Sequence, residues 1–282
     1  MPLNEKAMLV YLKISFWTAR KYDKRISQEI EDQYKADNAG RFNKILIAKE
    51  HLANIQKIIS TARAFHYENT LPWNDNGGRL LPSANYFNYI RSISSFKDRY
   101  EAEVDNFLRV YPDLKEEAKN RLNGMFVAED YPEVQLLEEK FAFRTNILPL
   151  PAANDFRVNM SDSEVESIRS SIQQQVKEAA ESAMQDLWQR LFKVVSHMVE
   201  RLIEPDNKFR NSLVTNIADL CELLPKLNIT DDPKLNEAVE EIKAKLTVHD
   251  SQALRDDKLL RSKTAVEAQR IMNKMRHYQR AA

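Results

Sequence analysis

The sequence contains only one cysteine, Cys221, and four glycines in 282 residues. A single cysteine excludes an internal disulfide and is typical of proteins in a reducing compartment. The scarcity of glycine disfavours an architecture of many strands and tight turns, because such turns often need backbone conformations that only glycine adopts readily. The low glycine content therefore favours a mainly α protein.

Net charge and long apolar runs are also absent. The 42 basic residues balance the 42 acidic residues, so the overall charge points neither to nucleic acid nor to an anionic membrane surface. No apolar stretch approaches the roughly 18 residues of a membrane-spanning helix, and the amino-terminal residues lack the pattern of a secretory signal. We therefore expect a cytoplasmic protein with no membrane partner.

Motifs for catalysis and metal binding are missing as well. The five histidines are scattered, and no pair of them has the spacing of a zinc site. Gly77-Gly78 lacks the following Lys-Ser/Thr of a phosphate-binding loop, and Cys221 lies among leucines, as inert buried thiols do. We expect no catalytic residue, no metal and no cofactor. The alternative, an enzyme with a site assembled from scattered carboxylates, would need a bound metal or a deep polar pocket.

The dominant feature of the sequence is a long helical pattern from Ser161 to Glu204. Ser161 and Glu164 have the spacing of a capping box, and no proline or glycine interrupts the pattern before Pro205. Apolar or small residues recur every three or four positions, at Val165, Ile168, Ile172, Val176, Ala179, Ala183, Leu187, Leu191, Val194, Met198 and Leu202. A second apolar stripe consists of Met184, Trp188, Phe192, Val195, Val199 and Ile203. We expect the helix to contact other helices, from this chain or from a second copy in a homo-oligomer, with Trp188 and Phe192 as candidate partner-binding residues.

The first half of the sequence predicts a helical hairpin and a small sheet. Helical periodicity covers Arg41–Glu68, and it resumes at Ser83, which we expect to cap a second long helix that ends at Pro112. The alternating pattern of Leu9–Trp17 predicts a strand, which we expect to pair with Asp155–Met160. Shorter helices are expected at Ile26–Tyr34, Asp113–Asn123 and Asp130–Phe141.

After the long pattern we expect three further helices, at Asn207–Leu224, Pro233–Thr247 and Asp250–Arg280. Asp232 and Pro233 are residue types preferred at the N-cap and at the first helical position. The sequence thus predicts a helical hairpin domain with a small β patch in residues 1–160, and a long helix with a C-terminal helical region in residues 161–282. The expected fold class is mainly α, an elongated long-helix hairpin or coiled-coil-like bundle with a minor two-strand β patch.

Asn69–Pro82 holds the densest group of turn-forming residues, with Asn76-Gly77 at its centre. It is either a tight connection, with Trp73 buried against a short hairpin, or a recognition loop. In a recognition loop Trp73 and Arg79 would be the anchors, because tryptophan and arginine dominate binding hot spots. Both are therefore candidate partner-binding residues.

The last expected helix has the sharpest charge pattern. At about 100° per residue, its basic residues lie within about 160° of one another. This basic face consists of Arg255, Lys258, Lys263, Arg270, Lys274, Arg276 and Arg280. It could bind nucleic acid, an acidic partner or the acidic stretch Glu101–Phe141 of another copy. The simpler alternative is the solvated face of a packed helix.

Several short peptides resemble an uncharacterised family from tailed phages and bacteria: TLPW (Thr70–Trp73), GRLLP (Gly78–Pro82), FLRVYPDL, DYPEVQLLEEKF and DFRVNMSDSEV. Genes of this domain-of-unknown-function family often lie beside those of a MoxR-type AAA+ ATPase and a von Willebrand A protein. The resemblance implies a phage or prophage setting in a bacterial host cytoplasm. It also implies a protein partner, such as an AAA+ ATPase or a host factor, but no site residues.

Two functional hypotheses follow. The first is a non-enzymatic scaffold, adaptor or inhibitor that acts by protein–protein contacts as a homo-oligomer. The alternative is a nucleic-acid-associated protein that binds through the basic face of the last helix. The absence of aromatic residues on that face disfavours binding of single-stranded nucleic acid.

Overall fold

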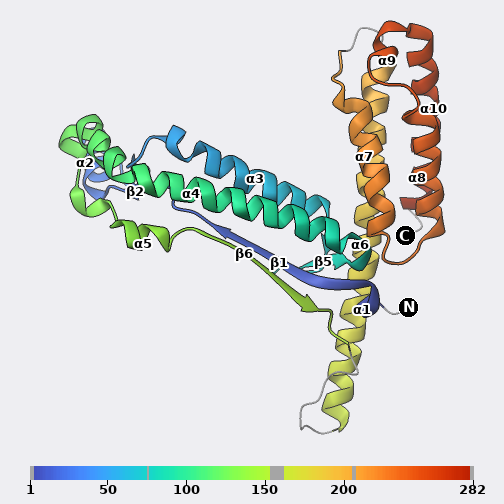
Figure 1. Ribbon diagram of the computed structural model, residues 1–282, viewed down its shortest axis with the longest axis horizontal. Coiled ribbons are helices and arrows are strands. Elements are labelled where there is room, and N and C mark those ends of the chain that lie inside the picture. The colour runs from blue at the N-terminus through green and yellow to red at the C-terminus, as the bar shows by residue number, and fades with distance from the viewer. Residues whose placement is uncertain (1–2, 75, 153–161, 205–207, 280–282) are drawn as a thin grey trace. The chain divides into compact units, whose positions relative to one another are not determined.

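The computed structural model describes residues 3–74, 76–152, 162–204 and 208–279 (Figure 1). The protein is mainly α, as predicted, and its described residues also form two small sheets. The longer helices are α2 (Lys24–Tyr34), α3 (Ala53–Glu68), α4 (Tyr86–Leu122), α6 (Asp162–Ile203), α7 (Ser212–Leu227), α8 (Pro233–Leu246) and α10 (Lys258–Gln279). The short helices are α1 (Leu3–Lys6), α5 (Val134–Glu138) and α9 (Ala253–Asp256). The strands are β1 (Ala7–Ser15), β2 (Arg20–Tyr22), β3 (Asn43–Ile45), β4 (Leu71–Pro72), β5 (Arg79–Pro82) and β6 (Ala142–Pro149).

The chain forms two compact units. Unit 1 contains Met1–Tyr11, Tyr67–Tyr89 and Asn146–Ala282. Unit 2 contains Leu12–His66 and Ile90–Thr145. This division differs from the expected boundary at residue 160, because the β4–β5 hairpin belongs with the C-terminal helices. Its side chains Leu71, Trp73 and Leu80 lie in the same apolar cluster as the buried face of α6.

The larger sheet has the strand order β4-β5-β1-β6. Strand β1 confirms the strand predicted at Leu9–Trp17, and it pairs antiparallel with β5, with Ala7 opposite Pro82 and Val10 opposite Arg79. The expected partner of β1, Asp155–Met160, lies outside the described residues. The expectation of a two-strand patch is wrong, because the β4–β5 hairpin and β6 extend the sheet to four strands.

The β4–β5 hairpin contains the predicted turn at Asn76-Gly77. Gly77 has a φ of 78°, which residues with a side chain rarely adopt. A Cβ atom on the neighbouring Gly78 would come within 2.9 Å of the Tyr11 ring, so a side chain at this position would have to displace that ring. Leu80 has no exposed surface. The hairpin is therefore part of the core of unit 1.

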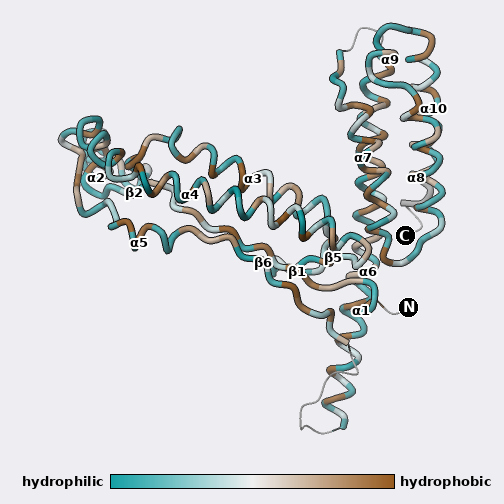
Figure 2. Tube along the Cα trace, viewed as in Figure 1, coloured by the Kyte–Doolittle hydropathy of each residue, from teal (hydrophilic) through white to brown (hydrophobic). Residues whose placement is uncertain are grey.

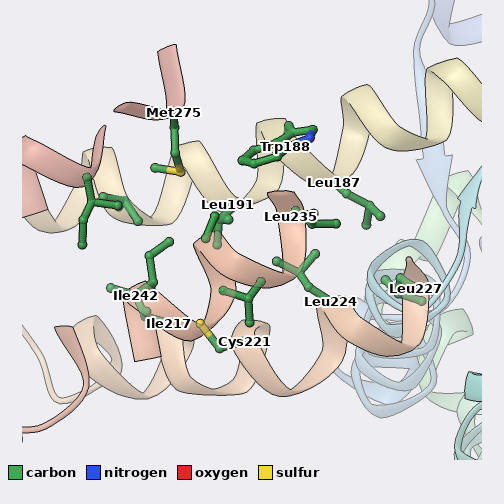
Figure 3. Packing of buried hydrophobic residues seen from close by; sticks show 14 of the residues in the cluster. Leu187, Trp188, Leu191, Ile217, Cys221, Leu224, Leu227, Leu235, Ile242 and Met275 are labelled. Carbon is green, nitrogen blue, oxygen red and sulfur yellow. The ribbon is translucent and has the colours of Figure 1, made fainter. Parts of the chain in front are cut away.

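The C-terminal half of α6 packs with α7, α8 and α10 as an antiparallel bundle within unit 1 (Figure 1). Helix α10 runs antiparallel to α6, since Arg261 near its start bonds the carbonyl of Leu202, while Arg276 near its end lies over the ring of Phe192. Apolar and polar positions alternate along these helices, as is typical of helices that bury one side (Figure 2). The side chains that fill the bundle include Leu187, Trp188, Leu191, Ile217, Cys221, Leu224, Leu235, Ile242 and Met275 (Figure 3).

The predicted long helix is confirmed, since α6 is 42 residues long. Its expected cap, Ser161, lies outside the described residues. The second apolar stripe of α6 does not face solvent, because Trp188, Val195 and Val199 are buried in a cluster that includes residues of α7, α8 and α10. Of this stripe only the last residue, Ile203, is largely exposed, at 58%. The stripe therefore gives no reason to expect a homo-oligomer.

Helix α4 supplies aromatic side chains to the core of unit 2. The Tyr100 hydroxyl donates a 2.6 Å hydrogen bond to the carbonyl of Ser15. Trp17 packs against Phe107 and Tyr111, with ring centroids 6.3 and 5.8 Å apart. These contacts attach α4 to the end of β1 and to the chain segment that follows it.

Helix α3 runs antiparallel to α4 in the same unit. The Asn54 amide donates to the carboxylate of Glu103 at 3.4 Å, and the rings of Phe65 and Phe96 lie 5.7 Å apart. Helix α3 begins later than the predicted Arg41–Glu68, because residues 43–45 form strand β3, which pairs with β2. A short 3-10 helix, Lys49–Leu52, leads into α3.

Helix α4 continues through Pro112, which was expected to end it. Tyr111 and Leu114, on either side of the proline, are only 2% and 8% exposed, so burial holds the helix together across the missing backbone hydrogen bond. The expected separate helix at Asp113–Asn123 is therefore the last part of α4. The predicted cap of α4 is also wrong, because the Ser83 hydroxyl donates to the carbonyl of Lys6 and a 3-10 turn precedes the helix.

Aspartate caps begin two of the C-terminal helices. Asp232 caps α8, as predicted, by accepting a 2.9 Å hydrogen bond from the backbone N–H of Lys234. Asp257 interrupts the helix expected at Asp250–Arg280. Its backbone is extended, and its carboxylate accepts from the N–H groups of Leu259 and Leu260, so that α9 and α10 are separate helices.

Candidate functional site

A basic cleft on unit 1 is the most distinctive surface of the described chain. It has a volume of about 1190 Å³ and lies beside the helices α6 and α7. Six lysines and arginines and one histidine line it, against three carboxylates. These charged residues are Arg79, Arg190, Lys193, His197, Arg201, Lys208, Arg210, Glu68, Asp186 and Asp219. The cleft therefore has a net positive charge although the whole chain has none.

Two elements place basic side chains along the cleft without pairing them with other described side chains. Lys193, His197 and Arg201 lie four residues apart on α6, a spacing that puts them on one face of the helix. Lys208 and Arg210 lie just before α7. All five are exposed, and none of their side chains has an ion-pair or hydrogen-bond partner in the part of the chain that the structure describes. They are available to an anionic ligand.

Arg190 and Arg79 have a different role at one end of the cleft. Arg190 pairs with Asp186 at 2.7 Å and donates to the carbonyls of Tyr67, Glu68 and Thr70. These carbonyls lie at and just beyond the C-terminus of α3, where the helix dipole favours a cation. The guanidinium of Arg190 is therefore held by the protein and fixes the wall of the cleft.

Arg79 completes the same wall. It donates to the hydroxyl of Thr70 at 2.6 Å and to the carbonyl of Thr70 at 3.0 Å, and its guanidinium lies 4.8 Å from the centre of the Tyr67 ring. Burial lowers the pKa of Arg79, and the nearby charge of Arg190 lowers it further. This candidate partner-binding residue thus lies at the cleft, but its hydrogen bonds are directed into the protein.

The floor of the cleft is apolar. Val194 of α6 and Leu220 and Leu223 of α7 are half-buried, and Leu213 is 5% exposed. The ring of Phe209 closes one side, beneath the guanidinium groups of Arg255 and Arg261. A ligand that fills this cleft would meet an apolar strip edged by positive charge.

Of the other candidate partner-binding residues, the two tryptophans lie in the core and Phe192 packs against it. Trp73 is 9% exposed and Trp188 is 4% exposed, and both belong to the apolar cluster of unit 1. Phe192 is half-buried, and Arg276 lies over its ring at 5.9 Å. The two tryptophans are therefore packing residues, because a partner could not reach them without opening the bundle.

The basic face expected on the last helix is largely engaged within the chain. Arg270 and Lys274 donate to the carboxylate of Glu241 on α8, at 2.6 and 2.9 Å. The hydrogen bond from Lys274, followed by that from Arg270, lowers the pKa of Glu241. These two basic residues therefore join α10 to α8, and they do not form a free cationic surface.

The remaining members of that face are dispersed. Arg255 belongs to α9 and donates to the carbonyl of Phe209 and the side chain of Asn211. Arg280 lies outside the described residues, and Arg276 covers Phe192 as described above. Lys258 and Lys263 are exposed and have no side-chain partner among the described residues. The face is therefore not a continuous basic surface.

The sequence contained part of the signal for the cleft. The spacing of Lys193, His197 and Arg201 is visible in the sequence. Charged residues at this spacing usually indicate only the solvent-exposed face of a helix. Lys208 and Arg210 come just before α7, and sequence alone does not show that α7 packs beside α6. The convergence of the two groups could be seen only in the fold.

The described residues show no group of three or more His, Cys, Asp or Glu side chains that could hold a metal ion. Cys221 is 2% exposed, and burial raises the pKa of its thiol to about 11. None of the described helices is both long enough and apolar enough to cross a membrane.

Comparisons with known proteins give no relative for this chain. No protein-family model matches the sequence, and neither a curated protein nor a solved structure matches it. The resemblance to the phage and bacterial family therefore stays a prediction.

Proposed function

We propose that this protein is a non-enzymatic interaction protein, a scaffold, adaptor or inhibitor, and that its basic cleft binds an acidic amphipathic segment of a partner protein. The observation that carries this proposal is the group of four lysines and arginines, with His197, that have no side-chain partner among the described residues and line the cleft together with apolar side chains. Protein grooves of this kind take the apolar side of a partner helix, while the charges at the rim select its polar residues.

An acidic protein segment fits the cleft better than nucleic acid does. Asp219 and Glu68 lie among the basic residues and would repel any anionic group, so charge alone does not distinguish the two ligands. Leu220 and Leu223 offer contacts to apolar side chains, which a phosphate backbone lacks. The expected nucleic-acid surface on the last helix has also lost support, since Arg270 and Lys274 are paired with Glu241.

The resemblance of the sequence adds a biological setting to the proposal. We place the protein in the cytoplasm of a bacterial host, in a phage or prophage context, with an AAA+ ATPase or a host factor as partner. Self-association is a separate proposal, and the burial of Trp188, Val195 and Val199 removes its main argument. Light scattering at micromolar concentration tests it directly.

A peptide-binding experiment tests the cleft. The probe is a fluorescent helical peptide of glutamates with leucines at helical spacing, and the comparison probe has glutamine in place of each leucine. We expect the leucine peptide to bind more tightly, because it alone fills the apolar floor. A short DNA duplex is the third probe, and tighter binding of the duplex than of either peptide would favour the nucleic-acid alternative.

Charge reversal locates the binding surface. The double variant Lys193→Glu, Arg201→Glu should weaken binding of the leucine peptide by about tenfold or more, because it replaces two attractions with two repulsions. The matched control is Lys258→Glu, Lys263→Glu, which reverses two exposed charges on α10. Equal affinities for the wild type and both variants would refute the role of the cleft.

A further inference from the structure

A second pocket lies wholly within unit 2. It has a volume of about 690 Å³, and its walls come from the segment after β1, from strands β2 and β3, and from α3. Sites for small organic molecules usually measure about 300–1,000 Å³. This unit 2 pocket is therefore of a size for a small molecule and too small for a partner helix.

The charges that line the unit 2 pocket are all positive. Arg20 of β2, Lys49 at the start of the 3-10 helix and Arg63 of α3 line it, and no carboxylate does. Arg20 and Lys49 have no side-chain partner among the described residues. Arg63 donates to the carbonyl of Ile14 at 3.0 Å, which engages one of its terminal nitrogens and leaves other donors available. Such a lining favours an anion.

Neutral hydrogen-bonding groups accompany the cations. Gln56, Ser60 and Arg63 lie on one face of α3, since they follow one another at intervals of four and three residues. Thr18, from the segment after β1, also lines the pocket. The side chains of Thr18, Gln56 and Ser60 make no hydrogen bond to the described residues. They can therefore bind the oxygen atoms of a ligand.

The floor of the unit 2 pocket is apolar and firmly packed. Ile47, Leu52 and Ile59 are 2%, 1% and 2% exposed and support this floor, while the half-buried Phe16 and Ile45 present its apolar surface. A fully hydrated inorganic ion gains nothing from such a surface, whereas an apolar or aromatic group does. The ligand should therefore have two parts, an anionic group and a compact apolar body.

We propose that the unit 2 pocket binds a small organic anion, a phosphate or carboxylate group joined to an apolar or aromatic body. The anionic group lies among Arg20, Lys49 and Arg63, and the body rests on Phe16 and Ile45. This site is independent of the basic cleft, because the two share no residue. Failure of one proposal leaves the other unaffected.

Calorimetric titration of the full chain tests the pocket with four probes. Phenyl phosphate and benzoate carry both parts of the ligand, inorganic phosphate carries only the charge, and benzyl alcohol carries only the aromatic body. We expect one of the two aromatic anions to bind at a single saturable site, about tenfold more tightly than either partial probe. Comparison of the two aromatic anions shows whether the pocket prefers phosphate or carboxylate.

The double variant Arg20→Gln, Lys49→Gln should weaken binding of the better aromatic anion by about tenfold. The matched control is Lys13→Gln, Lys57→Gln, which removes two exposed charges of unit 2 that do not line the pocket. The proposal is overturned if neither aromatic anion binds the wild type saturably, or if both double variants bind equally well. The wild-type titration decides the question even if the first variant fails to fold.

Discussion

The ammonium group of Lys44 lies 2.7 Å from the carboxylate of Asp130, although Lys44 is only 2% exposed. Asp23 approaches the same ammonium group at 3.3 Å, and the carbonyl of Met125 accepts a 2.9 Å hydrogen bond from it. Lys44 belongs to β3, Asp23 precedes α2, and Asp130 lies in the loop after α4. A single buried cation therefore joins three parts of unit 2.

Replacement of Lys44 by methionine should destabilise unit 2 by about 2–3 kcal/mol, because Asp130 and Asp23 would keep their charges without a partner. Urea unfolding gives this free energy, and hydrogen exchange shows whether the loss falls within unit 2. Lys97→Met is a suitable control, because its ion pair with Glu101 is exposed and lies elsewhere in unit 2. A loss no larger than that of the control would show that solvent screens the two carboxylates.

The same cluster predicts a pH dependence. The backbone N–H of Ile26 and the ammonium group of Lys44 lower the pKa of Asp23. Its contribution to stability is therefore complete above the unfolded pKa of about 3.9 and is lost as the pH falls through the lower folded pKa. Asp23→Asn keeps a residue that can cap α2 but loses the ion pair. The free energy of unfolding of this variant should therefore fall less at acid pH than that of the wild type.

The pKa of Lys44 determines how the stability of unit 2 changes at alkaline pH. Burial tends to lower its pKa, but the hydrogen bonds to Asp130 and Asp23 outweigh burial, and the pKa is raised. The stability that these bonds provide is complete below the unfolded pKa of about 10.4 and is lost as the pH rises through the higher folded pKa. Urea unfolding at a series of pH values should show a decline at alkaline pH in the wild type that Lys44→Met lacks.

Arg261 is expected to be essential for the bundle of unit 1. It is 7% exposed and donates to the carbonyls of Arg201, Leu202 and Glu204, which the end of α6 would otherwise leave unpaired. Arg261→Gln should lower the free energy of unfolding by about 2–3 kcal/mol. The exposed Lys263→Gln should change it little. Urea unfolding followed by tryptophan fluorescence distinguishes the two outcomes.

Replacement of Pro112 should make the protein more stable. It is exposed within α4, where it lacks a backbone donor but contributes little packing. Pro112→Ala should therefore raise the free energy of unfolding, by about 1–3 kcal/mol. Thermal unfolding of this variant measures the change. A lower melting temperature would mean that α4 requires a bend at this position.

The sequence predicted secondary structure correctly where a regular apolar spacing or a capping residue was enough to define the element. The regular apolar spacing of α6, the Asp232 cap of α8 and the alternating residues of β1 all belong to this class. Pro112 misled the prediction, because burial of Tyr111 and Leu114 outweighs the intrinsic preference of proline. Tertiary packing of this kind cannot be read from a single sequence.

The candidate sites were harder to predict than the elements. The charge pattern of the last helix was visible in the sequence, but nothing there showed that Glu241 would lie opposite Arg270 and Lys274. Prediction of the basic cleft required the opposite information, namely that no carboxylate among the described residues pairs with Lys193 or Arg201. A charge pattern in a sequence indicates a binding surface only when the structure shows which side chains lie beside each charged residue.

The discontinuous make-up of unit 1 decides how the chain can be divided for experiments. A fragment that starts at residue 161 would keep the four packed helices but would lose Leu71, Trp73 and Leu80, which fill the same cluster. Such a truncation would expose leucine and tryptophan surface and should aggregate on expression. A useful shortened version should instead retain residues 67–89. It should replace the two segments of unit 2, Leu12–His66 and Ile90–Thr145, with short linkers.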